Sequence, residues 1–198
     1  MPVSGPMQRT VTVLLALLAA LPLAAATIDV QVTYPDGAPI RDAVVYAIPS
    51  KPVPVGHKVA TMDQRDRTFM PHVLPVQTGT WIEFPNSDNI RHQVYSLSPA
   101  KRFQLPLYSG KPAFPLQFEK AGIVTLGCNI HEQMSAFIVV VDTPYFAKTE
   151  GAPAVLRDLA PGAYTLRVWY PGMREEPKAQ PVTLRAEDHP ALTFVATK

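Results

Sequence analysis

The sequence predicts an all-β fold, and three observations support this class. Proline accounts for 22 of the 198 residues, and proline interrupts helices because it lacks an N–H and its ring clashes with the preceding turn. Short segments rich in β-branched and aromatic residues recur along the chain, separated by proline, glycine and aspartate. No segment keeps a helical spacing of apolar residues beyond about ten positions. At most, residues 99–105 form one helical turn or two.

Composition narrows the possible functions. The chain carries 18 basic and 16 acidic residues, for a net charge of +2, and 47% of its residues are hydrophobic. Such a chain is not disordered, and its near-neutral charge gives no electrostatic reason to expect nucleic-acid binding. A single cysteine excludes an internal disulfide framework. It leaves a buried thiol, an intermolecular bridge or a metal-binding thiolate.

The first residues have the parts of a secretory signal peptide. Arg9 precedes an apolar run at residues 11–23, and three alanines follow at 24–26. The run is shorter than the roughly 20 residues of an ordinary membrane span. We therefore expect a signal peptide at 1–26, cleavage after Ala26, and a periplasmic or secreted protein with no membrane span in the mature chain. The alternative is an uncleaved anchor helix.

The predicted strands begin directly after this segment. Residues 28–32 alternate apolar and polar side chains, as a half-buried strand does. A turn signal, Tyr-Pro-Asp-Gly, follows at 34–37, and a second strand is expected at 43–48. The proline-rich stretch at 49–54 is predicted to be a linker or a crossing between domains.

A different block follows, and then the last strands. In the middle block we expect strands at 74–76, 81–84, 92–97, 116–118, 122–126 and 136–141. The final part of the chain is expected to form strands at 163–169, 181–185 and 192–196. Many short strands at regular spacing are typical of sandwiches and barrels.

The two outer pieces resemble the halves of one known sandwich. The segments VQVTYPDGAPIRDAVVYA and GAPAVLRDLAPGAYTLRVWYPG are similar to the opening and closing motifs of a transthyretin-like, carboxypeptidase-regulatory-type β-sandwich. This resemblance implies a second small sandwich built from residues 27–50 and 144–198, with a domain at 55–143 inserted between them. Two independent, unrelated flanks are the alternative.

The strongest local motif is Cys-x2-His-x2-Met at residues 128–134, between the predicted strands 122–126 and 136–141. Thiolate, imidazole and thioether are ligands that suit copper far better than magnesium or calcium. A second imidazole is available from His92, at the end of the polar loop in FPNSDNIRHQV. Two histidines, one cysteine and a weak axial methionine form the ligand set of a blue-copper electron-transfer site. The candidate metal ligands are His92, Cys128, His131 and Met134.

Residues 65–141 resemble the cupredoxins, the plastocyanin and amicyanin group of blue copper proteins. The F-x-N-x-D-x(3)-H-x-V segment matches the surroundings of their first histidine ligand, and the C-x2-H-x2-M segment matches their short ligand loop. The resemblance implies a Greek-key β-sandwich that holds one copper ion, which cycles between Cu(I) and Cu(II). Gln93 stands where many cupredoxins have an asparagine that bonds to the cysteine loop, and Ile130 where amicyanin-like loops hold proline. With its flanks, the chain is similar to exported bacterial proteins labelled methylamine utilisation protein.

Each candidate ligand also has a purely structural interpretation. Cys128 alone would be an inert buried thiol, the two histidines would be satisfied structural residues, and Met134 would fill the core. His72 is a rival ligand, although a structural role at the surface is the preferred interpretation. His57 and His189 are expected to be solvated.

The function predicted from these residues is single-electron transfer to or from another exported redox protein or enzyme. A closed site with four protein ligands leaves no position for a substrate, so we expect no enzymatic activity. A copper chaperone or sensor would use the same ligands and remains the alternative. A third interpretation is a structural or adhesive sandwich whose loop binds nothing.

Overall fold

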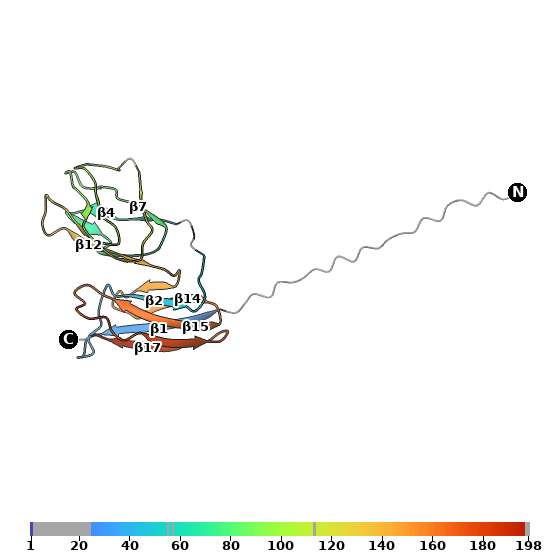
Figure 1. Ribbon diagram of the computed structural model, residues 1–198. Coiled ribbons are helices and arrows are strands. Elements are labelled where there is room, and N and C mark those ends of the chain that lie inside the picture. Colours follow the sequence, from blue (N-terminus) through green and yellow to red (C-terminus); the bar gives the residue numbers. More distant parts are fainter. Residues whose placement is uncertain (2–24, 55, 57, 113, 197–198) are drawn as a thin grey trace.

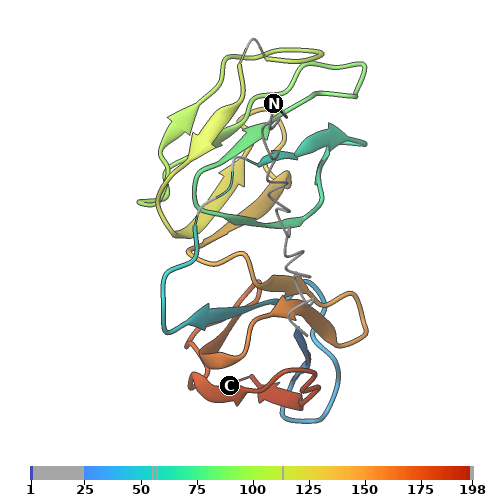
Figure 2. The same ribbon diagram turned by 90° about the vertical axis from the view of Figure 1, so that its right-hand side faces the viewer.

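The computed structural model describes residue 1, residues 25–112 apart from 55 and 57, and residues 114–196. Seventeen strands and no helix occur in this part of the chain, which confirms the predicted all-β class. Two β-sandwich bodies lie one above the other and are joined by crossing segments (Figures 1 and 2). Among the described residues, no helix is long and apolar enough to cross a membrane.

One body, which we call the flanking sandwich, is built from both ends of the described chain. A three-stranded sheet has the order β14-β1-β17, and a four-stranded sheet has the order β13-β2-β15-β16. β1 pairs antiparallel with β14 and parallel with β17. The strands are β1 (Ala26–Thr33), β2 (Val44–Pro49), β13 (Phe146–Lys148), β14 (Ala154–Leu159), β15 (Gly162–Trp169), β16 (Gln180–Leu184) and β17 (Ala191–Val195).

Apolar residues that alternate with polar ones along the strands form the core of the flanking sandwich. Ile28, Val30 and Val32 of β1 are all buried, and they share one hydrophobic cluster with Leu166 and Val168 of β15. Residues far apart in the sequence therefore bury one another's apolar faces. β1 itself begins at Ala26, whereas the predicted signal run at 11–23 lies outside the described residues.

The other body, the middle sandwich, is formed by residues 59–141. One sheet has the order β10-β7-β3, a second has the order β6-β12-β11-β8-β9, and β4 and β5 form a hairpin. The strands are β3 (Val59–Thr61), β4 (Asp63–Arg65), β5 (Thr68–Met70), β6 (Val73–Gln77), β7 (Thr80–Glu83), β8 (Tyr95–Ser96), β9 (Phe103–Gln104), β10 (Leu116–Phe118), β11 (Gly122–Gly127) and β12 (Ser135–Val141).

The structure adds detail at two places where the sequence left local structure open or expected a longer strand. Residues 99–105 form no helix: a turn at 99–100 leads into β9. Of the strand expected at 92–97, only β8 is regular. His92 instead forms an isolated antiparallel bridge with Tyr108. The segment after β9 remains its neighbour, but the register shifts by one residue, because Tyr95 pairs with Gln104 whereas His92 pairs with Tyr108 rather than Leu107.

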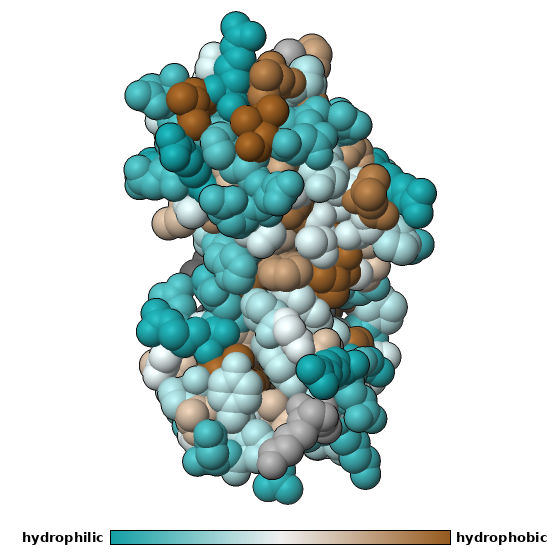
Figure 3. All heavy atoms as spheres, turned by 90° about the vertical axis from the view of Figure 1, so that its left-hand side faces the viewer, coloured by the Kyte–Doolittle hydropathy of each residue, from teal (hydrophilic) through white to brown (hydrophobic). Residues whose placement is uncertain are grey.

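β12 is buried on both faces and joins the two bodies. Ala136, Ile138 and Val140 face the core of the middle sandwich. The alternate residues face the flanking sandwich, in a junction cluster that contains Val44, Val73, Val139 and Val141 with Phe137 and Trp169 packed against it. Burial on both faces explains why β12 is a nearly continuous apolar run. The two bodies are in contact, with apolar side chains at their junction (Figure 3).

A polar contact reinforces the same junction. The Asp42 carboxylate of the flanking sandwich bonds to Nδ1 of His72 at 3.2 Å and to Nζ of Lys148 at 2.9 Å. His72 directly precedes β6 and lies edge-on to Phe137, with ring centroids 5.6 Å apart. Burial acts to raise the pKa of Asp42, but the bonds from Lys148 and His72 outweigh it and lower the pKa below its ordinary value of 3.8.

The Asp42→Asn variant should lower the free energy of unfolding at pH 7 by about 1 kcal/mol or less. The effect is small because the contacts of Asp42 with Lys148 and His72 are partly exposed to solvent. Since the pKa of Asp42 is depressed in the folded state, its stabilisation is present above about pH 4 and is lost as the pH falls through the folded-state pKa. The difference between wild type and variant should therefore shrink at about pH 2.5. Urea denaturation at both pH values measures it.

Asp158→Asn is the matched control. Asp42 and Asp158 both have positive φ, 59° and 60°, and asparagine tolerates this conformation as aspartate does. Among the described residues, Asp158 has no ion pair. An equal, pH-independent effect of both substitutions would contradict the role of Asp42 at the junction.

Candidate metal centre

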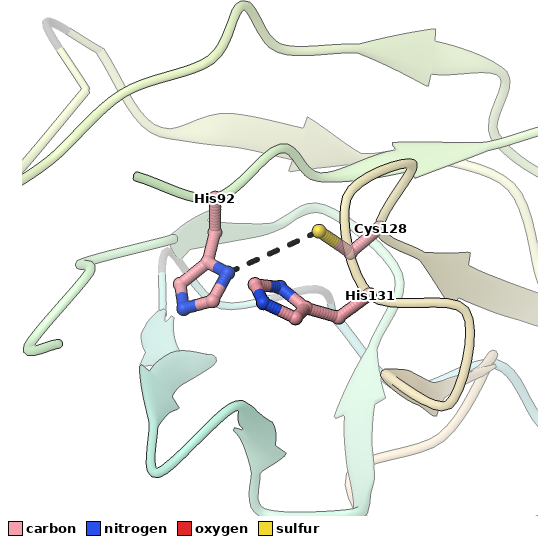
Figure 4. A group of neighbouring side chains, drawn as sticks. All are labelled: His92, Cys128 and His131. Carbon is pink, nitrogen blue, oxygen red and sulfur yellow. Dashed lines mark hydrogen bonds between the residues drawn. The ribbon is translucent and has the colours of Figure 1, made fainter. Parts of the chain in front are cut away.

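Three predicted ligands meet at one point of the middle sandwich. One donor atom from each of His92, Cys128 and His131 lies within 4.8 Å of the others, and His92 Nδ1 is 4.0 Å from Cys128 Sγ. The three side chains converge from two separate loops (Figure 4). Metal–nitrogen and metal–sulfur bonds of about 2.0 and 2.3 Å place trigonal donors about 3.5–3.8 Å apart. The observed spacing is therefore close to that of a bound metal.

His92 is held by the chain on both sides of it. Its ring is fully buried, and its backbone exchanges two hydrogen bonds with Tyr108, each of 3.0 Å. The loop that leads to it is organised by Asn86, whose side chain donates to the carbonyls of Ile90 and Tyr108 and accepts from the N–H of Asp88. This buried asparagine fixes the path of the polar loop before the histidine.

The loop with the other ligands is short and fastened at both ends. Gly127, the last residue of β11, pairs with Ser135, the first residue of β12. Within the loop, the N–H of Met134 donates to the carbonyl of His131 at 3.0 Å, which closes a turn. Met134 is 1% exposed and belongs to the same hydrophobic cluster as Cys128. The structure therefore places Met134 in the core beneath the loop.

A side-chain bridge links the two ligand loops. The Asn129 amide donates to Oε1 of Gln93 at 2.6 Å, and the Gln93 amide donates to the carbonyl of Leu105 at 3.0 Å. Gln93 follows the first histidine and Asn129 follows the cysteine. A bond between the loops is thus made here by a glutamine, whose extra length reaches a side chain of the cysteine loop.

An orphaned donor atom tests whether the site fits a metal. Nδ1 of His131 is buried and has no hydrogen-bond partner among the described residues. Burying a polar atom without a partner costs free energy, and a metal ion bound between the imidazoles and the thiolate would supply one. The two histidine rings have centroids 5.0 Å apart. The residues present therefore fit a single small metal ion with soft or intermediate ligands.

Sequence reasoning missed Tyr108, whose side chain lies beside the site. Its hydroxyl donates to the carbonyl of Phe84 at 2.6 Å and accepts a bond from the Gln64 amide. Burial is the main cause that raises the pKa of Tyr108 to about 12; the bond from Gln64 opposes it, and the charge of Asp63 adds to it. The phenol therefore stays protonated and keeps its bond to Phe84. No motif marks this residue in the sequence.

Asp88 was also missed, although it stands inside the motif around His92. Its carboxylate lies 2.7 Å from Nε2 of His92 and accepts the N–H groups of Asp66 and Arg67. Burial acts to raise the pKa of Asp88, but these hydrogen bonds outweigh it and lower the pKa. The sequence feature that could have indicated this contact is the position of Asp88 four residues before His92.

His72 and His189 lie outside the cluster. His72 takes part in the junction with Asp42, which agrees with the structural role preferred from the sequence. His189 pairs with Asp29 at 3.1 Å and is more than half exposed. His57 lies outside the described residues.

Comparisons with known proteins find partial similarities. No family model and no curated protein matches the chain. A copper-containing nitrite reductase from Thermus scotoductus SA-01 is 27% identical, with a TM-score of 0.39, over 46% of this chain and 25% of the reductase. A purple cupredoxin from Nitrosopumilus maritimus is 20% identical, with a TM-score of 0.37, over 41% of this chain and 99% of its own. A reduced amicyanin variant is 20% identical, with a TM-score of 0.39, over 48% of this chain and 99% of the amicyanin chain. The assignment of the site rests on its own residues.

Gly127 allows a close approach next to the ligand loop, and this gives a test of packing. A Cβ at this position would lie 2.7 Å from Cζ of Tyr95 and 2.8 Å from its hydroxyl. Gly127→Ala should therefore force the ring aside and lower the free energy of unfolding by about 1–3 kcal/mol. Chemical denaturation measures it. Tyr95→Leu, which removes the clashing atoms, should recover part of the loss in the double variant, and additive effects would contradict this account.

Proposed function

We propose that this protein is an exported copper-binding electron carrier. The observation that supports it is the convergence of His92 Nδ1, Cys128 Sγ and a ring nitrogen of His131 within 4.8 Å. These donors come from loops that are fixed by backbone pairing and by the bond between Gln93 and Asn129. A site held in this way keeps its ligands nearly still.

The donor set favours copper over the other common metals. Structural zinc sites usually combine four cysteine and histidine ligands, whereas this chain has a single cysteine. Magnesium and calcium prefer oxygen ligands. One thiolate, two imidazoles and a buried thioether beneath the loop match a copper site with a weak axial ligand.

In this proposal His92, Cys128 and His131 would hold the ion, and the thioether of Met134 would be the fourth and weakest ligand. When bound, copper would supply one-electron chemistry between Cu(I) and Cu(II). The protein would contribute rigidity, because His92 is fully buried and the ligand loop is closed by a turn and paired at both ends. Little rearrangement of side chains would then accompany each electron.

The ligand loop also suggests where a partner docks. Ile130, next to His131, is 54% exposed, and His131 itself is partly exposed. His131 therefore provides the shortest path from the site to the surface. We propose an exported redox protein or enzyme as the partner, with this protein acting as a carrier rather than as an enzyme.

Absorption spectroscopy tests the proposal. The protein loaded with Cu(II) should be intensely blue, because charge transfers from a thiolate ligand to copper, and Cys128→Ser should abolish the colour. His72→Gln is the control: its side chain belongs to the junction, so the spectrum should not change.

Other outcomes would decide against electron transfer. A protein that stays colourless with Cu(II) but retains Cu(I) tightly would be a copper chaperone or sensor. A protein that binds neither ion would contradict both metal functions.

A separate measurement addresses Met134. Met134→Gln should lower the reduction potential while the colour survives, because a harder oxygen donor favours Cu(II), and Met134→Leu should raise it. Met62→Leu is the matched control, since Met62 is equally buried in the same cluster. Voltammetry of the three variants compares the potentials. Equal potentials in Met134→Leu and wild type would remove Met134 from the ligand set.

A further inference from the structure

A carboxylate outside the ligand set is the endpoint of three hydrogen bonds at the centre. Oδ2 of Asp88 is 2.7 Å from Nε2 of His92 and 3.0 Å from the N–H of Arg67. Oδ1 accepts the N–H of Asp66 at 2.7 Å. The bond to His92 thus forms on the ring nitrogen opposite to the one that faces Cys128.

The hairpin of β4 and β5 holds this carboxylate in place. Asp66 and Arg67 form its two-residue turn, and both have positive φ, 52° and 56°. A turn of this kind requires positive φ at both central residues and is usually built from asparagine, aspartate and glycine. Arginine is an unfavourable choice there, and such backbone strain persists only where the surroundings determine it. The Asp88 carboxylate is that determinant, because it accepts both N–H groups of the turn.

The acceptor chemistry of the carboxylate then decides how His92 is used. An ionised carboxylate only accepts hydrogen bonds, so Nε2 of His92 has to carry the proton. The remaining nitrogen, Nδ1, keeps its lone pair and faces Cys128 Sγ at 4.0 Å. We propose that Asp88, supported by the Asp66–Arg67 turn, is a positioning residue that fixes the tautomer and orientation of His92 and places a negative charge behind this ligand.

An amide of the same shape replaces this group only in part. In Asp88→Asn, one of the two terminal atoms becomes an NH2 donor. If it occupies the Oδ2 position, it faces the donors of His92 and Arg67; if it occupies the Oδ1 position, it faces the N–H of Asp66. At least one N–H loses its acceptor in either case. The orientation with the amide oxygen at the Oδ2 position leaves fewer N–H groups unpaired and keeps the bond to His92. Asp88→Asn therefore removes mainly the charge, whereas Asp88→Leu removes both acceptor oxygens at a similar volume.

Nuclear magnetic resonance on the metal-free protein tests the proposal without copper. Two-bond and three-bond correlations from ring protons to 15N, recorded where the imidazole is neutral, report the tautomer of His92. Wild type should show a single tautomer with the proton on Nε2, and Asp88→Leu, which removes both acceptor oxygens, should shift the population toward the Nδ1 tautomer. A proton on Nδ1 in the wild type would overturn the proposal even if the variant failed to fold, and so would an unchanged tautomer in a folded variant.

Asp63→Leu is the matched control for the tautomer, and Asp63→Asn is the matched control for the charge. Asp63 lies on the same hairpin, and its carboxylate accepts the Ser87 hydroxyl at 2.9 Å, so it also ties the hairpin to the loop before His92. Its substitution removes the same charge and a comparable contact between the hairpin and the loop, but Asp63 forms no hydrogen bond with a ring nitrogen of His92. The tautomer of His92 should stay as in the wild type. A shift equal to that of Asp88→Leu would show a general loosening of the loop and overturn a specific role of Asp88.

The copper-loaded protein gives a second readout, which rests on the proposed function. Loss of a carboxylate partner of a metal-bound histidine typically weakens metal affinity by about 10–100-fold. Because the lost charge is negative, Asp88→Asn should weaken Cu(II) binding more than Cu(I) binding. Each tenfold difference raises the reduction potential by about 59 mV. If the reduction potential of Asp88→Asn is no higher than that of Asp63→Asn, the proposed effect of the Asp88 charge on the copper ion is overturned. If the wild type binds no copper, the proposed function is contradicted, but the tautomer test still applies.

Discussion

The double-sided packing of β12 is the constraint on which the rest of the structure depends. One set of its side chains fills the core beneath the metal centre, and the alternate set forms the junction with the flanking sandwich. Its first residue, Ser135, also pairs with Gly127 and so closes the ligand loop. A change in the position of this strand would therefore alter the core, the junction and the loop together.

The sequence was sufficient for the features that depend on local pattern. Alternating apolar residues predicted the strands that became β1, β2 and β15, and the proline-rich composition predicted a fold without helices. The motif at 128–134 indicated ligands because a loop between two strands confines its side chains. The structure adds the distances, which show that His92 meets Cys128, 36 residues further along the chain, and His131.

The features that could not be predicted depend on contacts between segments that the sequence does not show as pairs. His92 is placed by a bridge to Tyr108 rather than by a regular strand, and no periodicity marks such a bridge. The hairpin at 63–70 contains Asp66 and Arg67 at positive φ, where a turn signal would have been glycine or asparagine. Its conformation is set by Asp88, which is distant in the sequence, so propensity alone could not reveal it.

These contacts form successive layers around the candidate centre. The ligands are nearest, and each ligand segment is fixed by one further bond: Gln93 to Asn129 between the loops, and Asp88 to His92 behind the ring. The outer layer is backbone, supplied by the turn at 66–67 and by the pairing of Gly127 with Ser135. Because a polar side chain fixes a position only when it is itself held, precision at the ligands requires order in the outer layer. The unusual residues at the hairpin turn are thus best explained by the demands of the centre.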